Sequence, residues 1–191
     1  LATPLVPGKV VTGALQLWTD TDWFALPSTP GRIYRFLVTP LALETQVRLV
    51  GGDGTALRTW TSFQPMGLSF KASTATYLEV SSKSQGLGGY RVLAEDLGTD
   101  DAGETPATAS PLSVGSPALA AAIQYEGDVD VFSFEAAAGA LSLVVTTTGL
   151  STSLRVDSAS GATVASGSGP SLPVVLPSAG TYHLQVGSAQ Q

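Results

Sequence analysis

Cysteine is absent from this 191-residue chain, and histidine occurs once. Without cysteine there can be no disulfide, no thiolate zinc site and no thiol nucleophile. His183 lies in a predicted strand beside Tyr182 and Leu184, so we expect it to face outward, and no Gly-x-Ser-x-Gly motif is present to complete a Ser-His-Asp triad. We therefore predict that the chain has no catalytic residues and is not an enzyme.

Long apolar runs are also missing. Stretches such as residues 141–145 and 172–176 are strand-sized, far below the roughly 20 residues of a membrane-spanning helix. We therefore predict no membrane span. The chain begins at Leu1, without a methionine or an apolar leader, and we expect it to be a processed or excised part of a longer exported protein.

Charged residues make up only 13% of the chain, and they are unevenly distributed. Residues 1–91 hold eight of the nine lysines and arginines with five acids, whereas residues 92–191 hold Arg155 and ten acids. A nucleic-acid surface needs clustered basic residues. Here the basic residues are scattered singly, so we expect no nucleic-acid partner.

The residues that are abundant indicate a β protein. There are 21 glycines and 12 prolines, many serines, threonines and valines, and no segment with a sustained helical period. Short apolar segments are separated by turn signals such as Pro30-Gly31 and Gly51-Gly52-Asp53-Gly54. Seven or eight strands in about 95 residues predict an all-β sandwich with a jelly-roll-like topology.

The sequence repeats itself once, at a spacing near 108 residues. Residues 19–26 match residues 127–134 at 108, whereas Tyr34, Phe36 and Val38 match apolar residues only at 107. A one-residue slip within a strand would turn every side chain to the wrong face, so we place the deletion in the turn near Gly31 and Gly139. We predict two tandem β-sandwich domains, residues 1–96 and 97–191. The segment that closes the first copy, residues 88–92, has no counterpart before Gln191, so we expect the second copy to lack its last strand and the natural chain to continue.

Acidic residues crowd around the start of the second copy. Eight of the 15 acids lie between Glu95 and Asp130. Such crowding is relieved most simply by a hard dication with six to eight oxygen ligands, which favours calcium. The alternative is a solvated linker followed by an Asp-x-Asp sequence that caps a turn.

Three motifs in order resemble the bacterial pre-peptidase C-terminal domain: residues 100–112, 127–132 and 179–186. The first copy is similar at residues 20–24, 31–34 and 88–90. The resemblance implies β-sandwiches appended to secreted bacterial peptidases and other exported proteins, often removed during maturation. Such domains are similar to the collagen-binding domains of bacterial collagenases, which bind calcium through an acidic segment and the Asp-x-Asp turn.

The resemblance also implies a set of metal ligands in the second copy, which are Asp100, Asp101, Glu104, Asp128 and Asp130. The first copy keeps Asp20 and Asp22, but residues 1–4 contain no acid. These two aspartates are therefore weaker candidates, and we expect them to accept backbone hydrogen bonds in a turn.

Aromatic residues are concentrated in the first copy, which holds ten of the 14. Trp60 and Phe63 stand apart because the second copy has no matching aromatics. Exposed, they would form a surface for a peptide or glycan; alternatively, they cap one end of the sandwich.

These observations predict a non-catalytic accessory module pair in a secreted or cell-surface bacterial protein. Its partner would be a parent catalytic domain, a peptidase or other hydrolase, and its role would lie in export, maturation, stability or substrate binding. The alternatives are an adhesion module that binds an extracellular matrix protein or polysaccharide, and a structural spacer.

Overall fold

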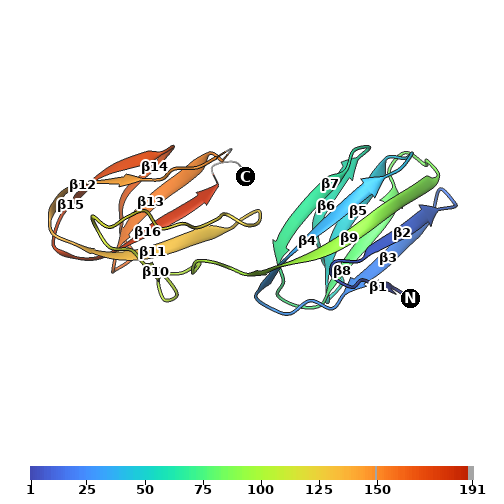
Figure 1. Ribbon diagram of the computed structural model, residues 1–191, viewed down its shortest axis with the longest axis horizontal. Helices are drawn as coiled ribbons and strands as arrows, with labels where there is room; N and C mark the ends of the chain where they lie inside the picture. Colours follow the sequence, from blue (N-terminus) through green and yellow to red (C-terminus); the bar gives the residue numbers. More distant parts are fainter. Residues whose placement is uncertain (149, 189–191) are drawn as a thin grey trace. The chain divides into compact units, whose positions relative to one another are not determined.

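The chain folds into two compact units, Leu1–Thr99 and Asp100–Gln191 (Figure 1). The computed structural model describes residues 1–148 and 150–188, and every regular element in these ranges is a β-strand. This confirms the predicted all-β class. The division falls three residues after the predicted 96/97 boundary, because the last strand of unit 1 runs through the acidic residues Glu95 and Asp96. No helix in the described ranges has the length and apolar character needed to cross a membrane.

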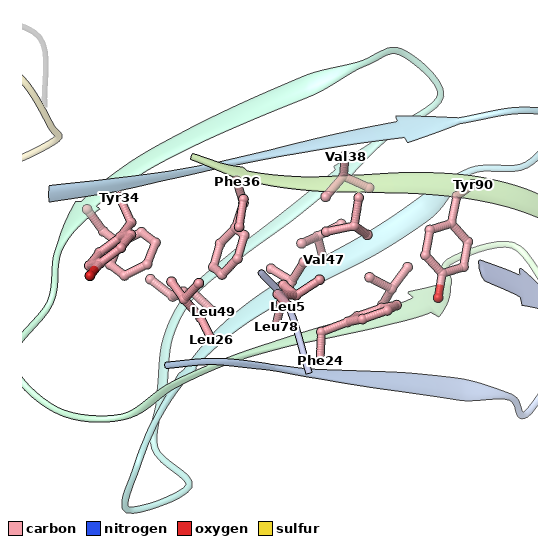
Figure 2. Packing of buried hydrophobic residues seen from close by; sticks show 14 of the residues in the cluster. Leu5, Phe24, Leu26, Tyr34, Phe36, Val38, Val47, Leu49, Leu78 and Tyr90 are labelled. Atoms are coloured by element: carbon pink, nitrogen blue, oxygen red, sulfur yellow. The ribbon is translucent and has the colours of Figure 1, made fainter. Parts of the chain in front are cut away.

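Unit 1 is a sandwich of two sheets. Its strands are β1 (Thr3–Pro4), β2 (Val10–Leu15), β3 (Thr21–Leu26), β4 (Arg32–Pro40), β5 (Thr45–Gly51), β6 (Ala56–Ser62), β7 (Met66–Lys71), β8 (Thr76–Ser82) and β9 (Gly88–Thr99). One sheet has the order β1-β3-β8-β5-β6 and the other the order β2-β9-β4-β7. A single apolar cluster fills the space between them (Figure 2).

Alternation along β4 and β9 builds this core. The side chains of Tyr34, Phe36 and Val38 are buried, as their spacing predicts, and Phe36 stacks on Phe70 with ring centroids 5.3 Å apart. From β9, Tyr90 and two further inward side chains are fully buried in the same cluster.

Unit 2 repeats the first of these sheets. Its strands are β10 (Ser110–Pro111), β11 (Val129–Ala136), β12 (Gly139–Val144), β13 (Thr152–Ser158), β14 (Thr163–Ser168), β15 (Ser171–Leu176) and β16 (Gly180–Ser188). The order β10-β11-β16-β13-β14 corresponds strand by strand to β1-β3-β8-β5-β6. Phe24 pairs with Leu78 in unit 1 as Phe132 pairs with Leu184 in unit 2, which confirms the register of the sequence repeat.

The second sheet of unit 2 is smaller. Strands β12 and β15 correspond to β4 and β7, and they form a two-stranded sheet among the described residues. Residues 117–123, which stand at the repeat spacing of 107–108 from β2, form no strand, and no described strand of unit 2 takes the place of β9. The core of unit 2 is therefore less covered: Leu141, the counterpart of the buried Tyr34, is only partly buried.

Candidate metal centre

The turn before β11 holds the first candidate ligand in place. The Asp128 N–H donates to the Tyr125 carbonyl at 3.2 Å, and the Gln124 N–H donates to Asp128 Oδ2 at 2.6 Å. The same turn occurs in unit 1, where the Gln16 N–H donates to Asp20 Oδ2 at 3.0 Å. One oxygen of this aspartate therefore caps a turn in both copies, which leaves the other oxygen for a ligand.

Asp130 is the second residue of β11, and Asp128 immediately precedes the strand. Each aspartate is only 2% exposed. A buried carboxylate is costly unless it is paired or bound to a metal ion. This position therefore needs positive charge or hydrogen-bond donors.

The segment after Thr99 brings further carboxylates to the same place. The Val131 N–H donates to the Gly103 carbonyl at 2.7 Å, and Ala102 is buried in the core of unit 2. These two contacts attach the acidic segment to β11. Glu104 is held in addition by a hydrogen bond from the Tyr125 hydroxyl.

All five predicted ligands meet in two overlapping groups. Asp100, Glu104 and Asp128 form one, and Asp100, Asp101 and Asp130 form the other. Within each group the oxygens lie within 4.8 Å of one another. Calcium binds oxygen at about 2.3–2.6 Å, so two ligands of one ion are at most about 5 Å apart. The carboxylate spacing therefore suits a calcium ion.

The electrostatics of the cluster point the same way. Burial raises the pKa of Asp128, and repulsion from Asp100 and Glu104 adds to this, while the Gln124 N–H offsets part of the rise. Burial, followed by repulsion from Asp128, Asp101 and Asp100, raises the pKa of Asp130 to about 7. Without a bound cation these carboxylates repel one another electrostatically, and a dication would remove that repulsion.

Buried oxygens without a hydrogen bond point to a further candidate ligand that the sequence did not reveal. Asp128 Oδ1, Asp130 Oδ1 and Gln124 Oε1 are buried and accept no hydrogen bond. Gln124 was not among the predicted ligands, although Gln16 stands at the matching position of the first copy. An amide oxygen is a normal calcium ligand.

Unit 1 uses its matching aspartates differently. Asp22 accepts a hydrogen bond from the Tyr90 hydroxyl, and Asp20 accepts one from the Gln16 N–H. Neither belongs to a group of three potential metal ligands in the part of the chain that the structure describes. Asp20 accepts a backbone hydrogen bond in a turn, as expected, whereas Asp22 accepts its hydrogen bond from a side-chain hydroxyl instead of the backbone.

The structure separates the two aromatic candidates. Trp60 lies on β6, is partly buried and packs against the core of unit 1. Phe63 lies in the turn after β6 and is 62% exposed. His183 on β16 is half-buried opposite Asp157 of β13.

Comparison with known proteins agrees with the resemblance in unit 2. Residues 128–188 match the profile of the bacterial pre-peptidase C-terminal domain. This segment contains Asp128 and Asp130, whereas the membership of unit 1 in the same family stays a prediction. No curated protein matches the chain.

Among solved structures, the chain is similar to the N-terminal CBM22-1-CBM22-2 tandem domain of Xyn10C from Paenibacillus barcinonensis. The sequence identity is 9% and the TM-score 0.30, over 96% of this chain and 85% of that chain.

Proposed function

We propose that this chain is a non-catalytic accessory module pair of a secreted or cell-surface bacterial protein, and that unit 2 binds one calcium ion. The ligands would be Asp100, Asp101, Glu104, Asp128 and Asp130. The observation that carries the proposal is the convergence of these carboxylates on β11 with buried oxygens that accept no hydrogen bond. The profile match over residues 128–188 supports the accessory role, and the parent catalytic domain would be a peptidase or other hydrolase.

The chemistry of the ligands favours calcium over other metals. Every candidate ligand atom is an oxygen, which disfavours zinc and copper, since those ions prefer imidazole or thiolate. Magnesium demands a near-ideal octahedron and keeps several waters, whereas calcium accepts many carboxylates in flexible geometry. The two carboxylate groups share Asp100, so together they offer more ligands than magnesium usually takes from protein, and this number suits calcium.

The bound ion would have a structural role. It would tie the acidic segment at the start of unit 2 to β11, two elements joined otherwise by the Gly103–Val131 hydrogen bond and the burial of Ala102. An ion present at 100 times its Kd stabilises the native state by about 2.7 kcal/mol. For a unit of this size that corresponds to a rise in Tm of roughly 10 °C or more.

Thermal unfolding in excess calcium and in chelator tests the proposal. We expect unit 2 to melt at a higher temperature with calcium, and the increment to shrink strongly in Asp101→Asn and Asp128→Asn. Asp20→Asn is the matched control, because Asp20 occupies the same turn position in unit 1 and should leave the increment unchanged. An identical Tm in calcium and in chelator would refute the metal site.

A second candidate function is binding of an extracellular matrix protein or polysaccharide by unit 1. It is supported by the exposed ring of Phe63, three residues after the partly buried Trp60. Pull-down on collagen and on insoluble polysaccharides tests it: Phe63→Ala should lose binding, and Leu57→Ala, a comparably exposed side chain on β6, should retain it. Binding that survives Phe63→Ala, or no binding by the native chain, would rule this surface out.

A further inference from the structure

The outer face of the five-stranded sheet in unit 1 carries a row of side chains that crosses four strands. Its members, each opposite the next, are Trp23 of β3, Glu79 of β8, Arg48 of β5 and Thr59 of β6. Their neighbours along the chain, such as Phe24 and Leu78, belong to the core (Figure 2). Alternation therefore points these four residues, which we call the outer row, away from the core.

Glu79 is the unusual member of the outer row, because it is buried on a face that points away from the core. It is 8% exposed, although its neighbours Leu78 and Val80 pack on the other side of the sheet. The Arg48 guanidinium donates to Glu79 Oε2 at 2.6 Å and so pairs the buried charge. A carboxylate has about four acceptor sites and an arginine five N–H donors, so both groups keep capacity for a ligand.

Two aromatic side chains adjoin this ion pair on the same face. Trp23 stands directly opposite Glu79 and is 38% exposed. Tyr77, two residues before Glu79 on β8, is partly buried and shares its face. Side chains at such opposite and diagonal positions lie about 5–8 Å apart, within reach of one ligand. The face therefore offers ring surface next to a hydrogen-bond donor and an acceptor.

Unit 2 shows that the fold does not require this combination. Its matching row holds Val131 and Gln185 where unit 1 has Trp23 and Glu79. The arginine is kept as Arg155, the only lysine or arginine after residue 91. The same sheet thus forms with an aliphatic side chain and a neutral amide at these positions. The exposed ring and the buried carboxylate of unit 1 indicate a role in binding.

The ligand must match a flat face that combines an aromatic ring with donors and acceptors of no net charge. A sugar ring has a face of C–H groups, which packs on the negative face of an aromatic ring. Its rim of hydroxyls both donates and accepts hydrogen bonds. Strands lie about 4.8 Å apart, so the row from β3 to β6 is about 14 Å long, enough for a short run of sugars. Neutral β-1,4-linked sugars with equatorial hydroxyls present the flattest C–H faces.

We propose that the outer row of unit 1 binds a neutral β-1,4-linked polysaccharide, with one sugar ring stacked on Trp23 and its hydroxyls bonded to Glu79 and Arg48. The proposal rests on the second candidate function in placing a polysaccharide on unit 1, and it assigns the binding to the sheet face instead of the turn at Phe63. It is independent of the calcium ligands, which belong to unit 2.

Titration of the full 191-residue chain with cellohexaose and with xylohexaose, followed by tryptophan fluorescence and calorimetry, tests this. We expect one site per chain and a shift of the tryptophan emission. Trp23→Val, which introduces the residue that unit 2 carries, should weaken binding at least tenfold and remove the emission shift. Trp18→Ala is the matched control, because this ring is 63% exposed in the turn before β3 and outside the outer row; it should bind normally.

A second variant separates hydrogen bonding from stacking. Glu79→Gln also copies unit 2, keeps the size of the side chain, and should weaken binding about tenfold, the loss expected for a hydrogen bond to a charged group. Circular dichroism confirms that both variants remain folded. The proposal is overturned if the native chain binds neither oligosaccharide, if Trp23→Val binds unchanged, or if an anionic galacturonate hexamer binds more tightly than both.

Phe63→Ala distinguishes this proposal from the second candidate function. Binding that is lost in Trp23→Val and kept in Phe63→Ala supports the outer row and removes the turn at Phe63. Binding that is lost in Phe63→Ala and kept in Trp23→Val overturns the outer row and leaves the second candidate function standing.

Discussion

The substitution Asp130→Asn should stabilise the protein in chelator and destabilise it when calcium is added. The substitution keeps the shape of the side chain and removes its charge. The pKa of Asp130 is raised from 3.8 to about 7 by burial and by neighbouring carboxylates. A difference of that size corresponds to about 4 kcal/mol of unfolding free energy when the group is ionised, and screening by solvent reduces this. In chelator at pH 8 we therefore expect Asp130→Asn to be more stable by roughly 1–3 kcal/mol.

The sign of the pH dependence follows from the direction of the pKa shift. Because the pKa is higher in the folded state, the native protein binds the proton more tightly than the unfolded chain does. The unfolding free energy of the metal-free native sequence should fall as the pH rises from about 4 to about 7, and then level off. The asparagine variant lacks this contribution, so its advantage should shrink below pH 7 and vanish only at about pH 4 and below. In calcium the native sequence should be the more stable one.

Urea unfolding can measure this with an internal control. All three tryptophans, Trp18, Trp23 and Trp60, lie in unit 1, so their fluorescence reports that unit alone. Circular dichroism reports both units. The tryptophan transition should be unaffected by Asp130→Asn, while the remaining dichroism transition moves. A variant that is less stable than the native sequence in chelator at pH 8, or a difference that does not depend on pH, would refute the electrostatic account of the cluster.

Two further predictions concern the frame around the site and the openness of the unit 2 core. A Cβ at Gly103 would lie 1.8 Å from the Thr108 carbonyl oxygen, so Gly103→Ala must displace the acidic segment. We expect at least a tenfold loss of calcium affinity by titration calorimetry. Unchanged affinity would contradict the role of this segment. In urea unfolding, Leu78→Ala in the closed core of unit 1 should lower the unfolding free energy by about 3–5 kcal/mol. Leu184→Ala, at the matching position in the less covered core of unit 2, should lower it by about 2 kcal/mol. Equal losses would contradict the difference between the two cores.

The register of the repeat could be predicted because buried strands constrain sequence tightly. Tyr34, Phe36 and Val38 alternate with outward residues, and only a spacing of 107 aligns them with apolar residues of the second copy, on β12 and just after it. That reasoning rests on a two-residue period that holds wherever one face of a sheet is buried.

The structure of residues 117–123 could not be predicted by the same reasoning. A strand forms only where a neighbour satisfies its backbone groups. In unit 1, β2 pairs with β9, but no described strand of unit 2 stands at that position, so the matching residues stay irregular. The spacing of the repeat predicted the missing strand, but not that residues 117–123 would be irregular beside it.

The candidate site was predictable in its carboxylates and not in its surroundings. Charge crowding and the resemblance pointed to the five acids that the structure brings together. Gln124 Oε1 is buried without a hydrogen bond in the turn four residues before Asp128, and a lone glutamine carries no sequence signal of metal binding. Trp60 was ambiguous because alternation on the edge strand β6 does not show which face the sandwich covers.

Calcium titration by isothermal calorimetry, after removal of bound metal, tests the account most directly. We predict one ion per chain, with Asp101→Asn and Asp128→Asn each weakening it strongly and Asp20→Asn leaving it unchanged. No heat of binding, or a stoichiometry and affinity that survive Asp101→Asn and Asp128→Asn, would contradict the metal centre in unit 2.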